Sequence, residues 1–115
     1  MERDFTYIDD IIEGTYKCFL KPATIDSIFD LTNPNLATSF APHRIFNIGN
    51  SVPIKLMHFI DVSEDALGKK AIKEFTEMSL GDVLSTASYI KALESWINFS
   101  PSTSIEKGIS KFAEW

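Results

Sequence analysis

The sequence predicts a mixed α/β chain with about four helices and two or three short strands, an α+β arrangement when taken as an isolated piece. Three patterns predict it: apolar residues at helical spacing over residues 8–20, an alternating segment over residues 44–48, and a capping-box pattern over residues 103–106. Two or three strands do not make a covered parallel sheet. The apolar helix faces are therefore typical of surfaces that contact further structure.

The first half of the chain predicts one extended segment, one helix and one loop. Residues 3–7 are expected to be extended, and residues 8–20 to form a helix that ends before Pro22. Asp9 or Asp10 is expected to cap the first turn of this helix. Its apolar stripe consists of Ile8, Ile11, Ile12, Tyr16, Phe19 and Leu20. Residues 22–43 are rich in Pro, Asn, Ser and Thr and predict a long flexible loop.

The second half predicts three helices with short strands between them. Residues 44–48 alternate and run into a Gly-Asn-Ser turn, which predicts a strand. A second helix is expected over about residues 55–67, closed by Gly68 in a left-handed conformation. Residues 71–78 suggest a further strand. A third helix is expected over residues 88–95 with Ser88 as a cap, and the last helix is expected to start at Thr103, with Glu106 reaching back.

The composition and net charge of the sequence disfavour several classes of partner. A net charge of −5 and a pI near 4.9 disfavour nucleic acid and anionic membranes, both of which need a basic face. No apolar run is long enough for a membrane span, and the first residues resemble no signal peptide, so we expect a cytoplasmic location. A single cysteine, Cys18, excludes an internal disulfide.

The residues alone offer little chemistry. The sequence contains no glycine-rich dinucleotide fingerprint, P-loop, His-Glu-x-x-His motif or nucleophile elbow. His43 and His58 are expected at the surface rather than at a metal, and Cys18 as a small buried hydrophobe. The neighbouring carboxylates Glu64 and Asp65 are expected to be solvated. Arg3 is either half of a surface ion pair or a bidentate clamp for a phosphate, and the residues alone favour the ion pair.

Five segments in order resemble extended short-chain dehydrogenase/reductases that act on nucleotide sugars. The segments are Arg3–Ile11 (RDFTYIDDI), Arg44–Ser51 (RIFNIGNS), Leu56–Ala71 with its Leu-Gly-Lys-Lys ending, Gly81–Val83 (GDV) and Phe99–Gly108. The amino-acid sequences of these segments are most similar to those of the UDP-glucuronate 4-epimerases of capsule and lipopolysaccharide pathways. The resemblance implies that residues 1–115 form the C-terminal substrate-binding part of an NAD-dependent epimerase, without the N-terminal NAD-binding domain.

This resemblance assigns roles to two residues. In the family, NAD bound to a Rossmann domain takes hydride from the sugar, and a Tyr-x-x-x-Lys pair handles the proton. Neither lies in this chain, so we expect no catalytic, cofactor-binding or metal-binding residue here. By resemblance Arg3 would contact the UDP diphosphate, Asp82 would contact the ribose hydroxyls, and the helix over residues 8–20 would pack against the Rossmann domain.

Three positions depart from the family pattern. Ser79 stands where relatives often carry Gln or Arg, Leu84 where Pro is usual, and Tyr89 where an Asp caps the next helix. These departures would weaken substrate binding.

Three functions follow as hypotheses. The first is a piece of a UDP-sugar 4-epimerase that contributes nucleotide-sugar binding and is inactive alone. The second is a non-enzymatic remnant that associates with itself through its apolar faces. The third is a piece of a nucleotide-sugar dehydratase or decarboxylase. We expect a homo-oligomer rather than a compact monomer.

Overall fold

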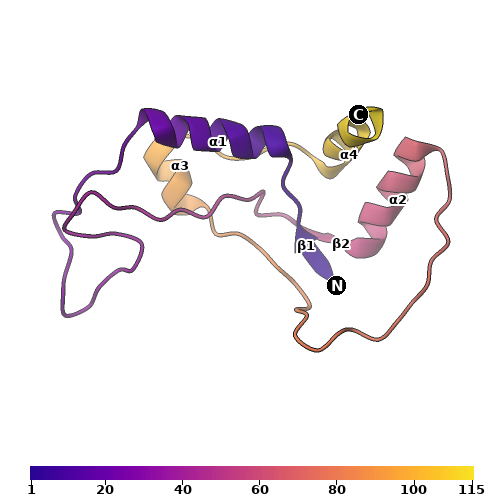
Figure 1. Ribbon diagram of the computed structural model, residues 1–115, viewed down its shortest axis with the longest axis horizontal. Helices are drawn as coiled ribbons and strands as arrows, with labels where there is room; N and C mark the ends of the chain where they lie inside the picture. The colour runs from indigo at the N-terminus through magenta and orange to yellow at the C-terminus, as the bar shows by residue number, and fades with distance from the viewer.

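The computed structural model describes residues 1–115 and contains four helices and one two-stranded sheet (Figure 1). The elements are β1 (Glu2–Asp4), α1 (Ile8–Leu20), β2 (Pro53–Lys55), α2 (Leu56–Leu67), α3 (Lys91–Ile97) and α4 (Ile105–Glu114). Helix α1 packs against α3 at one end of the molecule and α2 packs against α4 at the other, with the sheet between them. The predicted α/β class is confirmed.

Strand β1 joins segments from three parts of the sequence. It pairs antiparallel with β2, so that Arg3 lies opposite Ile54. On its other side the Glu2 N–H donates to the Leu84 carbonyl at 2.8 Å, and the Thr86 N–H donates to the Glu2 carbonyl at 3.3 Å. The N-terminal strand is thus the centre of a small three-segment layer.

The first two predicted helices are confirmed, but the predicted cap of the first is wrong. Helix α1 covers Ile8–Leu20, and α2 ends at Gly68, whose φ of 62° lies in the left-handed region. The N-cap of α1 is Tyr7, and its side chain makes no capping hydrogen bond. Asp10 instead accepts hydrogen bonds from the Ser102 and Thr103 N–H groups at 3.2 and 2.9 Å. The carboxylate is engaged by a distant segment, so it is not free to cap its own helix.

The last two helices exist as predicted, but both begin elsewhere. Helix α3 starts at Lys91 rather than Ser88, because the Ser88 N–H is bonded to the Asp4 carboxylate. Helix α4 is capped by Ser104, whose Oγ accepts a hydrogen bond from the Lys107 N–H at 3.3 Å. The predicted cap, Thr103, is therefore wrong by one residue.

The strand predictions were less successful. Residues 44–48 form no strand, since only Arg44 makes an isolated bridge, to Thr38. Residues 71–78 form neither a helix nor a strand, while β2 (Pro53–Lys55) lies where no strand was predicted. Residues 22–43 contain no helix and, apart from the same bridge, no strand pairing. The flexibility of this loop stays a prediction.

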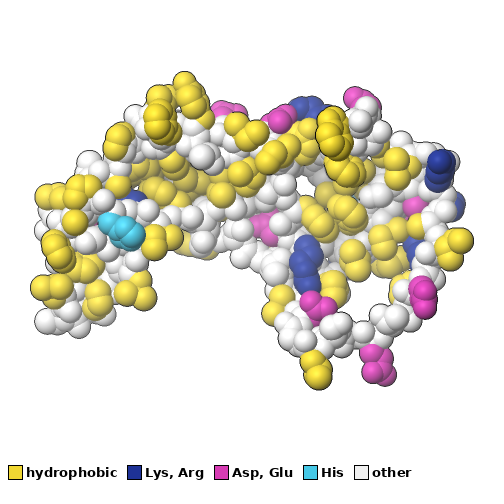
Figure 2. All heavy atoms as spheres, viewed as in Figure 1, with side chains coloured by type: hydrophobic (Ala, Val, Ile, Leu, Met, Phe, Trp, Pro, Cys, Tyr) yellow, Lys and Arg dark blue, Asp and Glu magenta, His cyan; other side chains and the backbone are white.

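The chain is expanded and thin, with a radius of gyration of 18.2 Å and extents of 55 × 33 × 16 Å. A compact domain of this length has a radius of gyration of about 13 Å. Only 8 of 115 residues are buried, and the buried apolar side chains are Ile90 and Leu93. Figure 2 shows hydrophobic side chains spread over the visible surface, including the region of α1. None of the helices has the length and apolarity that crossing a bilayer requires.

Candidate functional site

The structure places Arg3 beside the segment that carries Asp82. The Arg3 Nη1 group donates to the Val83 carbonyl at 2.9 Å and to the Glu2 carbonyl at 2.8 Å. Val83 directly follows Asp82. Arg3 and Asp82, which are 79 positions apart in the sequence, therefore lie in adjoining segments. The Nε and Nη2 donors of Arg3 make no hydrogen bond within the chain. They form one edge of the planar guanidinium and are suited to a two-oxygen contact with a phosphate.

Asp82 lies at the end of a tight turn. Its N–H donates to the Ser79 carbonyl at 3.1 Å, and Gly81 adopts a φ of 94°, which favours glycine. Its side chain is exposed and forms no ion pair. A free carboxylate at this position can accept hydrogen bonds from a pair of hydroxyl groups.

Asp4, the neighbour of Arg3, is the centre of a hydrogen-bonded junction that the sequence did not reveal. Its Oδ1 accepts a hydrogen bond from the Asn50 N–H at 3.1 Å, and its Oδ2 accepts from the Ser51 and Ser88 N–H groups at 3.1 and 2.9 Å. Its own N–H donates to Thr86 Oγ1 at 3.3 Å. We call Asp4 and these partners the Asp4 junction. In the sequence, Asp4 stands out only as part of the Arg3–Ile11 segment.

Gly49 allows the Asp4 junction to close. A Cβ atom at this position would lie 2.5 Å from Ser88 Cβ and 2.9 Å from Asp4 Oδ2, and would also overlap Ser88 Oγ. The turn over residues 49–51 can therefore approach Ser88 only because residue 49 has no side chain. The Gly-Asn-Ser sequence predicted a turn but gave no sign of this close approach.

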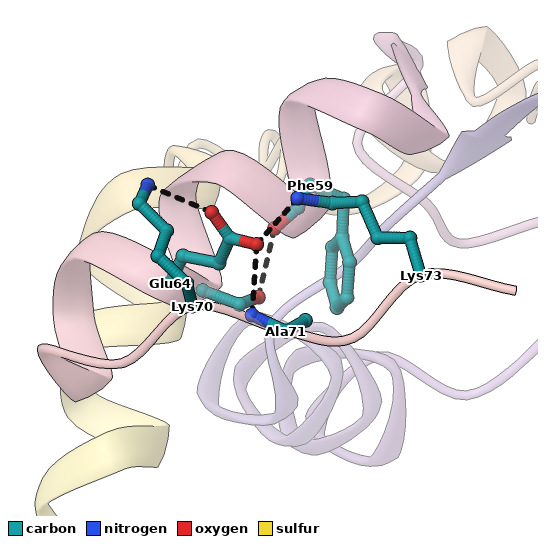
Figure 3. A network of polar contacts seen from close by, with 6 residues as sticks. Phe59, Glu64, Lys70, Ala71 and Lys73 are labelled. Carbon is teal, nitrogen blue, oxygen red and sulfur yellow. Dashed lines mark hydrogen bonds and ion pairs between the residues drawn. The ribbon is translucent and has the colours of Figure 1, made fainter.

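A second cluster of polar contacts lies at the end of α2 (Figure 3). Glu64 accepts hydrogen bonds from Lys70 Nζ at 2.8 Å and from the Ala71 N–H at 3.0 Å, and it also pairs with Lys73 Nζ. The Lys70 and Lys73 ammonium groups, together with the Ala71 amide, lower the pKa of Glu64 from its ordinary 4.5 to about 2. The side chain of Glu64 is 4% exposed, so the predicted solvated position is wrong. The lysines that follow α2 fold back over the carboxylate and cover it.

The other residues singled out in the sequence lie outside these contacts. His58 Nε2 lies 3.3 Å from Glu106, His43 is exposed and Cys18 is half-buried. No group of three or more His, Cys, Asp or Glu side chains could hold a metal ion. Ser79 and Leu84 contribute backbone carbonyls to the contacts described above, and Tyr89 is 73% exposed.

One cavity of about 320 Å³ lies between the β1–α1 connection, α2 and α4. Its walls are mostly apolar and include Phe5, Ile8, Phe59, Ile105 and Phe112. The rings of Phe5 and Phe59 stack at this point with centroids 4.4 Å apart. No lysine or arginine lines the cavity, so it is not suited to a phosphate.

Comparison with known proteins finds relatives that match this chain over its whole length. No protein-family model matches the sequence. The chain is 39% identical over 115 residues to "Protein CapI" of Staphylococcus aureus, covering all of this chain and 34% of that protein. It is 35% identical over 116 residues to a "Probable UDP-glucuronate 4-epimerase" of Rhizobium meliloti, with the same coverage of each. The chain thus spans about a third of the length of these relatives.

A solved structure also matches nearly the whole of this chain and about a third of its own. A variant of UDP-glucuronic acid 4-epimerase from Bacillus cereus, in complex with UDP-4-deoxy-4-fluoro-glucuronic acid and NAD, superposes with a TM-score of 0.71 and 25% identity. The match covers 96% of this chain and 30% of that one. Over nearly its whole length the chain is thus similar to about a third of an epimerase that was solved with NAD bound. The proteins to which the chain is similar include several that are named UDP-glucuronate 4-epimerase.

Proposed function

We propose that this chain supplies the nucleotide-binding part of a UDP-sugar 4-epimerase, with UDP-glucuronate as the sugar nucleotide. In this proposal residues 1–115 are one substrate-binding portion, residues 22–43 are a flexible loop, and NAD is held by an N-terminal domain outside the chain. A role in making a cell-surface polysaccharide and a cytoplasmic location belong to the same proposal.

The juxtaposition of Arg3 with the segment of Asp82 supports this function most directly. The free edge of the Arg3 guanidinium would bind the diphosphate, and the exposed Asp82 carboxylate would accept hydrogen bonds from the ribose hydroxyls. Arg3 lies in β1, and Asp82 comes two residues before Leu84, whose carbonyl accepts a hydrogen bond from the β1 backbone. The chain would therefore grip the nucleotide and leave hydride transfer to the cofactor-binding part.

The chain alone is expected to be inactive. Hydride removal and return need a bound dinucleotide and a proton-handling pair, and no residue described above fills either role. Purified chain supplied with NAD and UDP-glucuronate should show no epimerisation by chromatography of the sugar nucleotides. Turnover above the background of a boiled sample would contradict this expectation.

Binding of UDP and of uridine by the full chain, measured by isothermal titration calorimetry, tests the two residue roles. Arg3→Ala should weaken UDP binding by roughly 10- to 100-fold, the effect of losing a hydrogen bond to a charged group, and should leave uridine binding unchanged. Asp82→Ala should weaken the binding of both UDP and uridine, because both ligands carry the ribose. Asp61→Asn, at an exposed aspartate of α2 that forms no ion pair, is the matched control. Unchanged UDP affinity in Arg3→Ala would remove the proposed role of Arg3.

A second candidate function is self-association without catalysis. The observation that favours it is the apolar outer face of α1, where Ile8, Ile12, Tyr16 and Phe19 are 58–80% exposed. The two candidates differ in ligand: a self-associating remnant would form oligomers but would not bind UDP. The nucleotide-sugar dehydratase or decarboxylase alternative predicts UDP binding too and would be separated by the product that the whole enzyme forms.

A further inference from the structure

We propose that Asp4 is a positioning residue for nucleotide binding: its carboxylate fixes the strand that carries Arg3 against the segment that follows Asp82. The predicted effect on nucleotide binding rests on the proposed function. The coupling of β1 to the segment after Asp82 by the Asp4 carboxylate does not. Asp4 would touch no ligand. It would act by holding two other residues at the separation that a nucleotide needs.

The geometry shows how one side chain ties three segments together. Strand β1 supplies the carboxylate, the turn over residues 49–51 supplies two amide donors, and the segment before α3 supplies the Ser88 amide. The Asp4 N–H also bonds Thr86 Oγ1, so that two links join β1 to residues 86–88. Residues 83–86 are held at the same time by Arg3 and Glu2. The segment after Asp82 is therefore fixed at both ends of a six-residue stretch, Val83–Ser88.

Successive side chains of a strand point to opposite faces, so Asp4 can anchor β1 while Arg3 stays free to face a ligand. A carboxylate is the group that suits this task, because its two oxygens can accept several amide hydrogen bonds. An asparagine of the same shape would present an NH₂ group to one set of amide donors. Those contacts would be lost, and residues 86–88 could separate from β1.

Alternative roles for Asp4 give different results. If Asp4 only satisfied nearby amides, its loss would affect Asn50, Ser51 and Ser88 and nothing else. If Asp4 only stabilised the whole fold, its loss would loosen every element equally. The positioning role predicts an intermediate pattern, in which the pairing of Glu2 with Leu84 and Thr86 weakens while distant helices do not change.

Amide hydrogen exchange of the full chain, followed by NMR, distinguishes these patterns. In Asp4→Asn the Glu2 and Thr86 amides should exchange at least tenfold faster than in the unmodified chain. The Gly108 amide, which donates to the Ser104 carbonyl within α4, should be unchanged. Asp61→Asn, which removes the charge of an exposed aspartate that forms no ion pair, should alter none of the three. Unchanged exchange at Glu2 and Thr86, or equal acceleration at Gly108, would overturn the proposal.

Gly49→Ala tests the same junction without touching Asp4. The added methyl group overlaps Ser88 and should push it from the carboxylate, so the same two amides should exchange faster. A normal exchange rate at Thr86 in this variant would also count against the proposal.

Nucleotide binding then tests the consequence. If the unmodified chain binds UDP, Asp4→Asn should weaken binding roughly tenfold, and the added effect of Arg3→Ala should be smaller in this background than in the unmodified chain. Strictly additive effects would show that Asp4 does not act through Arg3. If the unmodified chain binds no UDP, the proposed function fails, whereas the exchange results still decide whether Asp4 couples the two segments.

Discussion

Three carboxylates hold together parts of this chain that a small apolar core could not hold. Asp4 joins β1 to the turn at residues 49–51 and to Ser88, Asp10 joins α1 to the approach of α4, and Glu64 joins α2 to the lysines after it. The buried hydrophobic core consists of Ile90 and Leu93, and of these only Leu93 is fully buried. Hydrogen bonds to charged groups stabilise more than neutral ones, and removing one partner leaves the other unsatisfied. Substitution of any of these three carboxylates should therefore lower the free energy of unfolding more than most other single substitutions.

The pKa of Glu64 makes the stability of this cluster dependent on acid. Its folded-state pKa is about 2, below the ordinary 4.5, so the stabilisation is fully present above about pH 4.5. It is lost as the pH falls from 4.5 towards 2, when protonation breaks the pairs with Lys70 and Lys73. Glu64→Gln should thus lower the thermal unfolding temperature at pH 7. The difference from the unmodified chain should shrink steadily below pH 4.5.

Glu77→Gln provides the matched control, since Glu77 is exposed and forms no ion pair. It should leave the unfolding temperature unchanged at every pH. A difference between Glu64→Gln and the unmodified chain that is as large at pH 2.5 as at pH 7 would show that the charge of Glu64 contributes nothing.

These carboxylates also show which residues the sequence could and could not identify. Arg3 and Asp82 were predicted as binding residues by resemblance to a family; the structure brings their segments together, and their roles stay predictions. Asp9 or Asp10 was expected to cap the first helix and Glu64 to face water, and both expectations were wrong. The local sequence shows a carboxylate and its neighbours, but the donors that engage Asp10 lie 92 and 93 residues further along. No periodicity or spacing encodes such a contact.

At the scale of elements, helices were predictable and strands were not. A helix makes its hydrogen bonds within one segment, so the apolar spacing over residues 8–20 was enough to fix α1. A strand needs a partner that can be anywhere in the chain. Residues 44–48 have the side-chain pattern of a strand: Phe46 and Ile48 are half-buried while Ile45 and Asn47 are exposed. They form no strand because no other segment of the chain pairs with their backbone beyond the bridge at Arg44.

The contact between this extended segment and α1 gives a prediction about packing. A Cβ atom on Gly14 would lie 2.5 Å from Ile48 Cδ1 and 3.1 Å from Phe99 Cε1. Overpacking of this kind costs about 1–3 kcal/mol, and the better helix propensity of alanine offsets up to about 1 kcal/mol of it. Gly14→Ala should therefore lower the free energy of unfolding by about 1 kcal/mol, measured by urea denaturation.

Gly108→Ala is a control of the same chemistry on another helix. The nearest atom to its Cβ would be Cδ2 of the Tyr7 ring, at 3.3 Å, and a ring can shift by a few tenths of an ångström. The propensity gain should then dominate, and this variant should be neutral or more stable by up to about 1 kcal/mol. If both alanine variants changed stability equally, the close packing of α1 on Ile48 would not be the cause.

At the scale of the whole molecule, the chain exposes more surface than its size requires. Its accessible surface is 8688 Å² for a mass of 12.9 kDa. A compact protein of this mass exposes about 6,300 Å², so roughly 2,400 Å² is in excess. Helix α1 is one source: Asp10 and Gly14 face inward, whereas Ile8, Ile12, Tyr16 and Phe19 lie on the nearly opposite side and are exposed. Contact with a further domain or with a second copy would cover such a face.

The isolated chain should therefore associate with itself, and α1 should carry the contact. Burying the outer face of α1 removes apolar surface from water, which is favourable by about 25 cal/mol per Å². In the structure no other segment of the chain covers this face. Sedimentation velocity of the purified chain should show a species larger than a monomer. Phe19→Lys should shift the distribution towards monomer, because a charge on this face makes its burial costly. Glu13→Gln raises the net charge by the same single unit on a different side of α1, and should leave the distribution unchanged. A compact monomer of the unmodified chain, or an equal response to both substitutions, would show that this face of α1 does not drive assembly.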